Sequence, residues 1–194
     1  QTMKKAAKFA LIKTIPIFLG YIFLGIAFGL LLQKSGLSVF WAFLISTLVY
    51  AGSMQFALVG ILTGGLSYVT TAVMTLFINS RHAFYGLTFI ERFKEMRKAY
   101  PYMVFSLTDE TYSLLCSMAR PSAFTDKEWK AATFFTAFFD QCYWIAGSVL
   151  GALMGELITF DTTGIDFAMT ALFVVICVDQ WKAAKTHIPA VTGF

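Results

Sequence analysis

Long apolar runs separated by short polar stretches fill most of this 194-residue sequence. A helix needs about 20 apolar residues to cross a bilayer, and five runs approach or exceed that length. These runs cover residues 14–33, 38–62, 66–90, 102–119 and 131–155. A sixth run, 167–178, is short unless Asp179 and Gln180 also lie at membrane depth. The pattern predicts an all-α, polytopic integral membrane protein with about six to seven transmembrane helices, some of them broken or re-entrant.

Two of the runs contain polar residues that suit a helix break. Tyr50-Ala51-Gly52-Ser53-Met54-Gln55-Phe56 interrupts the second run, and either a break or a continuous helix with one polar side fits it. The fourth run, Tyr102 to Ala119, holds Asp109 and Glu110 near its middle. A broken helix places unpaired N–H groups and a dipole end at the midplane, where transporters bind anionic groups.

The basic residues bear on which runs cross the membrane. With the amino end inside and six continuous spans, the 91–100 loop falls outside, although it carries four bases against two acids. That placement conflicts with the positive-inside bias. Two re-entrant segments, one before this loop and one after it, would move the loop inside. The Tyr50–Phe56 region and the Tyr102–Ala119 segment are the candidates, and charge counting leaves both topologies open.

Composition supports a bilayer as the solvent. Hydrophobic residues make up 58% of the chain and charged residues 13%, whereas soluble proteins have about 25% charged residues. The net charge of +4 comes from short Lys/Arg clusters beside apolar runs, a pattern typical of cytoplasmic membrane flanks and not of a nucleic-acid surface. We therefore expect one membrane domain over residues 1–194, in which the first run is retained and not cleaved as a signal peptide. The three cysteines, all in apolar runs, are expected to be buried: Cys116, Cys142 and Cys177.

An arginine and a histidine lie deep inside the third run, in Asn79-Ser80-Arg81-His82. Arginine costs about 2.5–3.5 kcal/mol at the centre of a membrane helix on insertion scales, so Arg81 should face protein and have partners. Asp109 and Glu110 are natural counter-charges. Adjacent helical residues diverge by about 100°, so we expect one of the two acids to pair with Arg81. The other should line a polar cavity or cap a helix break.

The fifth run contains another acid, Asp140, and three glycines spaced four apart: Gly147, Gly151 and Gly155. Overlapping G-x-x-x-G spacings predict a surface for close helix contact. The first run, with Gly20, Gly25 and Gly29, has a similar character, and Pro16 is expected near its entry, where a missing N–H is tolerated. For Asp140 we expect a functional role or an essential ion pair.

The sequence contains little that is typical of an enzyme active site. It lacks H-E-x-x-H, G-x-S-x-G and the phosphate-binding G-x-x-x-x-G-K-[ST] pattern. His82 and His187 stand far apart without metal-ligand spacing, so no metal, cofactor or catalytic residue is predicted. Ser53 with His82 would form a hydrolase dyad only if the two residues met in space.

A small zwitterion with an apolar side chain suits the intramembrane polar residues better. Arg81 can bind a carboxylate through two hydrogen bonds, and an acid can face an ammonium group. The predicted substrate-binding residues are Tyr50, Ser53, Gln55, Asn79, Arg81, Asp109, Glu110 and Asp140. His82 titrates near neutrality when unperturbed, and it is a candidate for proton coupling together with Asp109 and Glu110. A structural ion-pair cluster at the centre of a bundle would use the same charges.

Several motifs in order along the chain resemble the AzlC-type branched-chain amino-acid exporter family. They are Tyr50-Ala51-Gly52-Ser53-Met54-Gln55-Phe56, Asn79-Ser80-Arg81-His82 with Tyr85-Gly86, Thr108-Asp109-Glu110, the Pro16-to-Gly29 pattern and Val178-Asp179-Gln180-Trp181. The resemblance implies a multi-pass permease of the bacterial inner membrane that exports branched-chain and similar apolar amino acids. It also implies a small AzlD-type membrane subunit as partner. Family members are longer, so we expect a carboxyl-terminal helix to be missing here.

Two other classes of membrane protein stay open. A small-solute or ion channel would use the same buried charges along a wet pore, and a non-transporting scaffold subunit would use them to hold helices together. Flux separates the three classes, because a carrier saturates and counter-exchanges, a channel conducts passively and a scaffold does neither.

Overall fold

The computed structural model describes residues 2–157 and five isolated positions beyond them, 164, 167, 171, 174 and 178. Every regular element in that part of the chain is helical. The elements are α1 (Thr2–Lys34), α2 (Val39–Leu48), α3 (Gly52–Gly64), α4 (Tyr68–Lys94), the short 3-10 helix η1 (Arg97–Ala99), α5 (Tyr100–Phe105), α6 (Asp109–Ser117) and α7 (Asp126–Leu157). The predicted all-α class is confirmed. Cys177, Asp179, Gln180, Trp181 and His187 lie outside the described residues, as does most of the sixth run.

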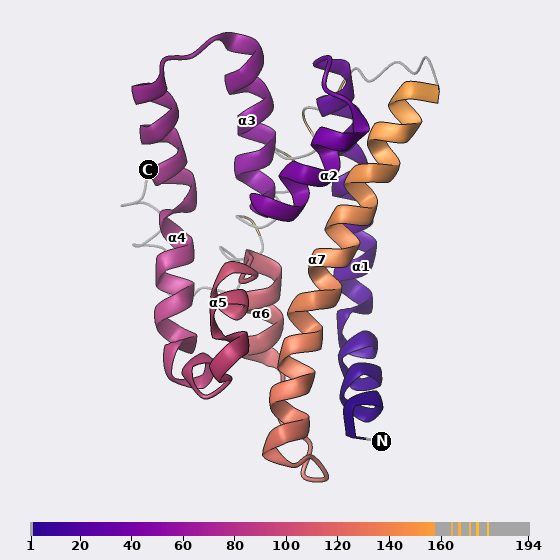
Figure 1. The fold of residues 1–194 in the computed structure, drawn as a ribbon, viewed down its shortest axis with the longest axis vertical. Coiled ribbons are helices and arrows are strands. Elements are labelled where there is room, and N and C mark those ends of the chain that lie inside the picture. The colour runs from indigo at the N-terminus through magenta and orange to yellow at the C-terminus, as the bar shows by residue number, and fades with distance from the viewer. Residues whose placement is uncertain are drawn as a thin grey trace.

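Helices α1 and α7 run side by side and in the same direction along the length of the molecule (Figure 1). Glycines let the two backbones touch: Gly25 lies against Gly147, and Gly29 lies against Gly151. The register continues to Gln33, which packs on Gly155. The close helix contact that the glycine spacing predicts is therefore confirmed. Pro16 does not lie near the start of its helix as expected, because α1 begins at Thr2.

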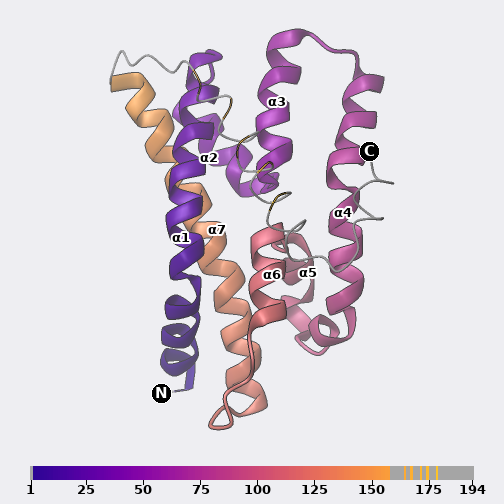
Figure 2. The same ribbon diagram turned by 180° about the vertical axis from the view of Figure 1, so that it is seen from behind.

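Two short helical hairpins enter the molecule from opposite ends (Figure 1). The first hairpin, α2 and α3, descends from the end where α1 finishes and returns to it. The second hairpin, α5 and α6, rises from the end where α4 finishes and returns there, as Figure 2 shows from behind. The tips meet near the centre, where the rings of Tyr50 and Phe105 have centroids 6.2 Å apart. Neither the second nor the fourth run is thus a single continuous helix.

Local backbone geometry explains where the two hairpins turn. At the first tip Tyr50 has a positive φ of 41°, a conformation that non-glycine residues rarely adopt and that cannot continue an α-helix. Helix α3 then begins at Gly52. At the second tip Thr108 is extended, and its hydroxyl caps α6 by accepting a hydrogen bond from the Thr111 N–H. Of the two alternatives that the sequence leaves open at Tyr50–Phe56, the structure has the break, and α6 begins at the acidic pair Asp109 and Glu110.

The basic clusters gather at one end of the molecule. The Lys5 ammonium donates to the carbonyl of Ala123 at 2.7 Å, and Lys130 pairs with Glu95 at 2.9 Å. The amino terminus, the 91–100 segment and the 120–130 segment therefore share one end. This arrangement agrees with the topology that has two re-entrant segments, and the alternative with six continuous spans is wrong for residues 2–157.

A long helix followed by a half-length hairpin occurs twice in the chain. The first copy is α1 with α2 and α3, and the second is α4 with α5 and α6. The two copies point in opposite directions (Figure 1). Inverted repeats with discontinuous helices are a common construction of secondary transporters.

Among the described helices, α1 alone is both long enough and apolar enough to pass as a membrane span by composition. Helices α4, with 27 residues, and α7, with 32 residues, are about 40 and 48 Å long at 1.5 Å per residue. They have the length to cross a hydrocarbon core of about 30 Å, but each carries ionisable residues. The outward faces of α1 and α4 expose large apolar side chains such as Phe23 and Phe77, which suits contact with lipid.

One cysteine is not buried as the sequence predicts. Cys142 is half-buried, but Cys116 is exposed. Cys116 lies on the side of α6 that borders the pocket described below. The prediction of a buried side chain is therefore wrong for Cys116.

A capping box starts α7 outside the apolar part of the chain. The Thr125 backbone N–H donates to Glu128 Oε2 at 2.8 Å, and the Glu128 N–H donates back to the Thr125 hydroxyl at 3.3 Å. The hydrogen bond from the Thr125 backbone, followed by those from the Thr125 hydroxyl and Lys5, holds the pKa of Glu128 below its ordinary value. A lowered folded pKa means that ionised Glu128 stabilises the fold at neutral pH. This contribution is lost as the pH falls through the folded value.

We expect Glu128→Gln to lower the melting temperature of the detergent-solubilised protein slightly at pH 7. The difference should shrink as the pH falls below the ordinary glutamate pKa of about 4.3 and through the lower folded value, because protonated Glu128 resembles glutamine. Glu91→Gln is the matched control, since Glu91 is an exposed acid paired only along its own helix with Lys94. A difference for Glu128→Gln that stays constant with pH would contradict the capping role of the charge.

Candidate functional site

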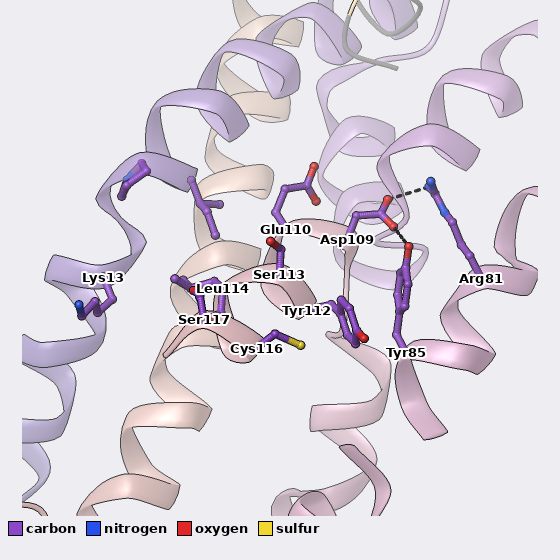
Figure 3. A pocket seen from close by; sticks show the side chains of 12 residues that line it. Lys13, Arg81, Tyr85, Asp109, Glu110, Tyr112, Ser113, Leu114, Cys116 and Ser117 are labelled. Carbon is purple, nitrogen blue, oxygen red and sulfur yellow. Dashed lines mark hydrogen bonds and ion pairs between the residues drawn. The ribbon is translucent and has the colours of Figure 1, made fainter. Parts of the chain in front are cut away.

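Arg81, which lies on α4, contacts the tips of both hairpins. Its guanidinium donates to the Ser53 hydroxyl at the start of α3 and pairs with Asp109 Oδ2 at 2.9 Å at the start of α6. The Tyr85 hydroxyl donates to the other carboxylate oxygen, Asp109 Oδ1, at 2.7 Å, as Figure 3 shows. The expectation that one of the two adjacent acids pairs with Arg81 is confirmed. Ser53 and His82, which were considered as a hydrolase dyad, contact different residues. The Ser53 hydroxyl is bonded to Arg81, and the ring of His82 packs on Tyr85 with centroids 5.9 Å apart.

Glu110 points away from Arg81 and toward α1. Its Oε2 accepts a hydrogen bond from the Tyr21 hydroxyl at 2.7 Å. The same hydroxyl lies 2.6 Å from the Oγ1 atom of Thr108. The roughly 100° turn between adjacent helical residues therefore sends Asp109 and Glu110 to different partners, as the sequence predicts.

Asp140 lies in the middle of α7 with none of its surface exposed. Its Oδ2 accepts a hydrogen bond from the Thr111 hydroxyl at 2.8 Å, and its Oδ1 has no partner among the described residues. Within the described residues Asp140 is therefore held by a hydroxyl, and the expected ion pair is not found there. A fully buried carboxyl with an unpartnered oxygen is costly in its charged form.

The remaining predicted residues divide into two groups. Gln55 is fully buried and serves the fold, because it donates to Ser46 across the first hairpin and accepts from the Trp144 indole at 2.8 Å. The Tyr50 hydroxyl and the Asn79 Oδ1 atom are buried without a hydrogen-bond partner in the described part of the chain.

A pocket of about 960 Å³ lies between α1, α4 and α6 (Figure 3). Its polar lining comes from Lys13 and Arg81 on opposite sides and from Asp109 and Glu110 between them. Apolar lining comes from Pro16, Ile17 and Leu114, together with the ring of Tyr112. Cavities of roughly 300–1,000 Å³ hold small organic ligands. The pocket therefore offers both signs of charge and an apolar wall to one small molecule.

The structure brings only part of the predicted set to this pocket. Arg81, Asp109 and Glu110 line it, whereas Tyr50, Ser53, Gln55, Asn79, His82 and Asp140 do not. Sequence reasoning missed Lys13, Tyr21 and Thr111. Tyr21 and Lys13 stand in or beside an apolar run with no local signal of their partners. Thr111 could have been found from the capping pattern that begins at Thr108.

These features define the class of protein. The chain is an all-helical membrane protein with an apolar outer face, two opposed hairpins and a cluster of ionisable residues where the hairpin tips meet. Residues 16–158 match the family model described as AzlC protein, and the chain belongs to that family. Membership places it among transport proteins and not among enzymes.

Relatives agree with this assignment. The branched-chain amino acid transport protein AzlC of Bacillus subtilis is 38% identical over 180 residues, which cover 93% of this chain and 70% of the relative. A membrane protein of Helicobacter pylori, uncharacterised, is 36% identical over 97% of this chain and 82% of its own length. The inner membrane protein YgaZ of Escherichia coli is 28% identical over 74% of this chain and 58% of its own length. No solved structure matches the chain.

Proposed function

We propose that this protein is the large subunit of a secondary transporter that exports branched-chain and similar apolar amino acids across the cell inner membrane. A small AzlD-type membrane subunit completes the permease, and transport is coupled to protons. The observation that carries the proposal is the pocket, in which Arg81 pairs with Asp109 and a second acid, Glu110, borders the same cavity beside an apolar wall. The name of the Bacillus subtilis relative supports the substrate class.

The pocket lining indicates how an amino acid would lie. The carboxylate takes the place of Asp109 on the Arg81 guanidinium, which is suited to bidentate binding. The ammonium group faces Glu110, the acid of the pocket that has no cation within hydrogen-bonding distance among the described residues. The side chain rests on Ile17 and Leu114. Tyr50 and Ser53 at the first tip, Asn79 on α4 and Asp140 on α7 support this site. His82, Asp109 and Glu110 remain our candidates for proton coupling.

The membrane orientation follows from the clustered bases. We place the amino terminus, the 91–100 segment and the 120–130 segment in the cytoplasm, as the positive-inside bias prefers. Helices α1, α4 and α7 then cross the bilayer, and each hairpin enters it from one side. Irregular backbone at membrane depth is tolerated where it is enclosed by protein or lines a wet cavity, and both tips satisfy this condition by packing on one another and on α7.

Efflux of preloaded, labelled leucine tests the proposal. The full-length protein is expressed with and without the small subunit in bacterial cells that lack their own exporters. We expect saturable efflux that requires both subunits and that is accelerated by external unlabelled leucine through counter-exchange. Cells with an empty vector and cells with the small subunit alone are the controls.

The other outcomes separate the remaining classes. Non-saturating passive flux without counter-exchange would identify a channel for small solutes or ions. No efflux of leucine or methionine from any combination, at normal membrane abundance, would overturn the substrate assignment and favour a scaffold subunit.

A further inference from the structure

A continuous chain of hydrogen bonds joins two acids, Glu110 and Asp140. The Tyr21 hydroxyl lies 2.7 Å from Glu110 Oε2 and 2.6 Å from Thr108 Oγ1. Thr108 Oγ1 lies 3.1 Å from Thr111 Oγ1, which lies 2.8 Å from Asp140 Oδ2. All four links are within or at the edge of the O–H···O hydrogen-bond range. Residues of α1, α6 and α7 thus form one connected path.

The number of protons on this path follows from the number of links in it. We take all four links as hydrogen bonds made at once, of which the three hydroxyls supply three protons. If all three hydroxyls point toward Asp140, the last link requires a proton on Glu110. If all three point toward Glu110, it requires a proton on Asp140. The path therefore holds one additional proton, which resides on one acid or on the other.

Most of the path is buried and shielded from water. Thr111 and Asp140 have none of their surface exposed, and Tyr21 and Thr108 are 4% and 6% exposed. Two ionised carboxylates in such surroundings would be costly, since neither has a cation within hydrogen-bonding distance among the described residues. Glu110, in contrast, borders the pocket. One end of the path is thus open to a ligand and the other end is enclosed.

The charged and titratable groups around the path do not substitute for its shared proton. The titratable or charged side chains that face it are Tyr50 from the first tip, Tyr102 from α5, Arg81 and Tyr85 from α4, Asp109 from α6 and, across the pocket from Glu110, Lys13 from α1. Asp109 is already matched by Arg81, and the tyrosines are neutral hydroxyls. No described cation therefore replaces the shared proton between Glu110 and Asp140.

We propose that Glu110, Tyr21, Thr108, Thr111 and Asp140 form a proton relay that couples occupation of the pocket to the protonation of Asp140. The proposal rests on the proposed transport function. In one step the Glu110 carboxyl gives its proton to Tyr21, whose own proton passes to Thr108. The Thr108 proton passes to Thr111, and the Thr111 proton passes to Asp140 Oδ2. Glu110 becomes a carboxylate, Asp140 becomes a neutral acid, and no other bond changes.

A substrate ammonium group gives this transfer its direction. A cation beside Glu110 favours the ionised form of that acid, so the proton moves to Asp140 as the pocket fills. Departure of the cation allows the reverse transfer. Substrate binding and the position of the proton are therefore linked through hydroxyls, without a water path.

Two conservative variants each remove one hydroxyl of the relay and so interrupt it. Tyr21→Phe keeps the ring that packs on Trp144, with centroids 5.4 Å apart, but removes the hydroxyl. Thr111→Val removes another hydroxyl at similar volume, and Thr111→Ser keeps it. The matched controls are Tyr143→Phe and Thr136→Val, since the Tyr143 and Thr136 hydroxyls lie outside the path.

The test uses the full-length protein with its small subunit, reconstituted in lipid vesicles. Leucine flux driven by an imposed pH gradient requires net proton movement, whereas leucine exchange at equal pH does not. We expect Tyr21→Phe and Thr111→Val to lower gradient-driven flux at least about tenfold and to change exchange by less than about twofold. Thr111→Ser and both controls should retain both activities.

Two results would overturn the relay. One is gradient-driven flux in Tyr21→Phe and Thr111→Val equal to that of the unmodified protein. The other is equal loss of flux and exchange in both variants, which would mean that the hydroxyls serve the fold.

Infrared spectroscopy separates failure of the relay from failure of the transport function. We expect a protonated-carboxyl stretching band at neutral pH that the double variant Glu110→Gln/Asp140→Asn removes. This band does not depend on leucine. A protein that moves no leucine but shows the band would contradict the proposed function alone, and absence of the band would overturn the relay.

Discussion

Arg81→Gln is expected to abolish most leucine efflux while leaving the protein in the membrane. The substitution removes the cation that pairs with Asp109 and the donor that holds the Ser53 hydroxyl. Both hairpin tips lose their shared partner on α4, and the pocket loses its carboxylate-binding group. Arg81→Lys should also lower efflux strongly, because a lysine retains the charge but cannot bind the substrate carboxylate with a planar fork.

The size of the effect follows from partial burial. The side chains of Arg81 and Asp109 are 30% and 28% exposed. Exposed pairs contribute up to about 1 kcal/mol, and removing one partner of a fully buried pair costs about 3–5 kcal/mol. The substrate carboxylate would meet Arg81 in the same partly buried surroundings, so we expect its binding to lose an intermediate amount of about 2 kcal/mol. This loss corresponds to a roughly 30-fold drop in efflux at about 1.4 kcal/mol per factor of ten.

Lys94→Gln is the control for charge on the same helix. Lys94 lies at the exposed end of α4 and pairs with Glu91 one turn away, so its removal should leave efflux unchanged. Efflux and membrane abundance are measured together in each strain. Normal efflux by Arg81→Gln at normal abundance would contradict the role of Arg81, and a matching loss of abundance would assign it to the fold.

The outline of the fold could be predicted because it depends on patterns that are local in sequence. Apolar run lengths located the helices, and Gly147, Gly151 and Gly155 indicated a close helix contact. The partner helix was not predictable, since the first run also carried glycines but so did other segments. Only three-dimensional packing pairs Gly25 and Gly29 with that stripe. The excess of bases in the 91–100 loop pointed to two re-entrant segments, and the observed hairpins remove the conflict.

The candidate site was predictable where opposite charges stood alone in apolar surroundings. Arg81 had few possible counter-charges, and helix geometry then separated Asp109 from Glu110. Tyr21 and Thr111 were missed because hydroxyl residues are common in membrane helices and carry no charge to demand a partner. Gln55 was assigned to a substrate for the opposite reason: a polar side chain in an apolar run looks functional until its two protein partners are known.

Gly29→Ala is expected to destabilise the protein more than any other single-methyl addition to α1. A Cβ atom at Gly29 would collide with the Ser148 carbonyl oxygen and lie 2.6 Å from the Ala152 nitrogen, both of them backbone atoms of α7. Backbone cannot move aside as the end of a side chain can, so α1 and α7 must separate. In a bilayer such close packing supplies much of the attraction between helices, because lipid tails are as apolar as the side chains.

Gly20→Ala is the matched control on the same helix, since a Cβ atom there meets nothing within 4 Å. Alanine is favoured over glycine in a helix interior by up to about 1 kcal/mol, so Gly20→Ala should be neutral or slightly stabilising. Overpacking at Gly29 costs about 1–3 kcal/mol, which lowers the melting temperature by roughly 2–12 °C for a chain of this size. Thermal unfolding in detergent measures both variants. Equal melting temperatures for the two would mean that α1 and α7 do not touch at Gly29, and the hydroxyl path from Tyr21 on α1 to Asp140 on α7 would lose its framework as well.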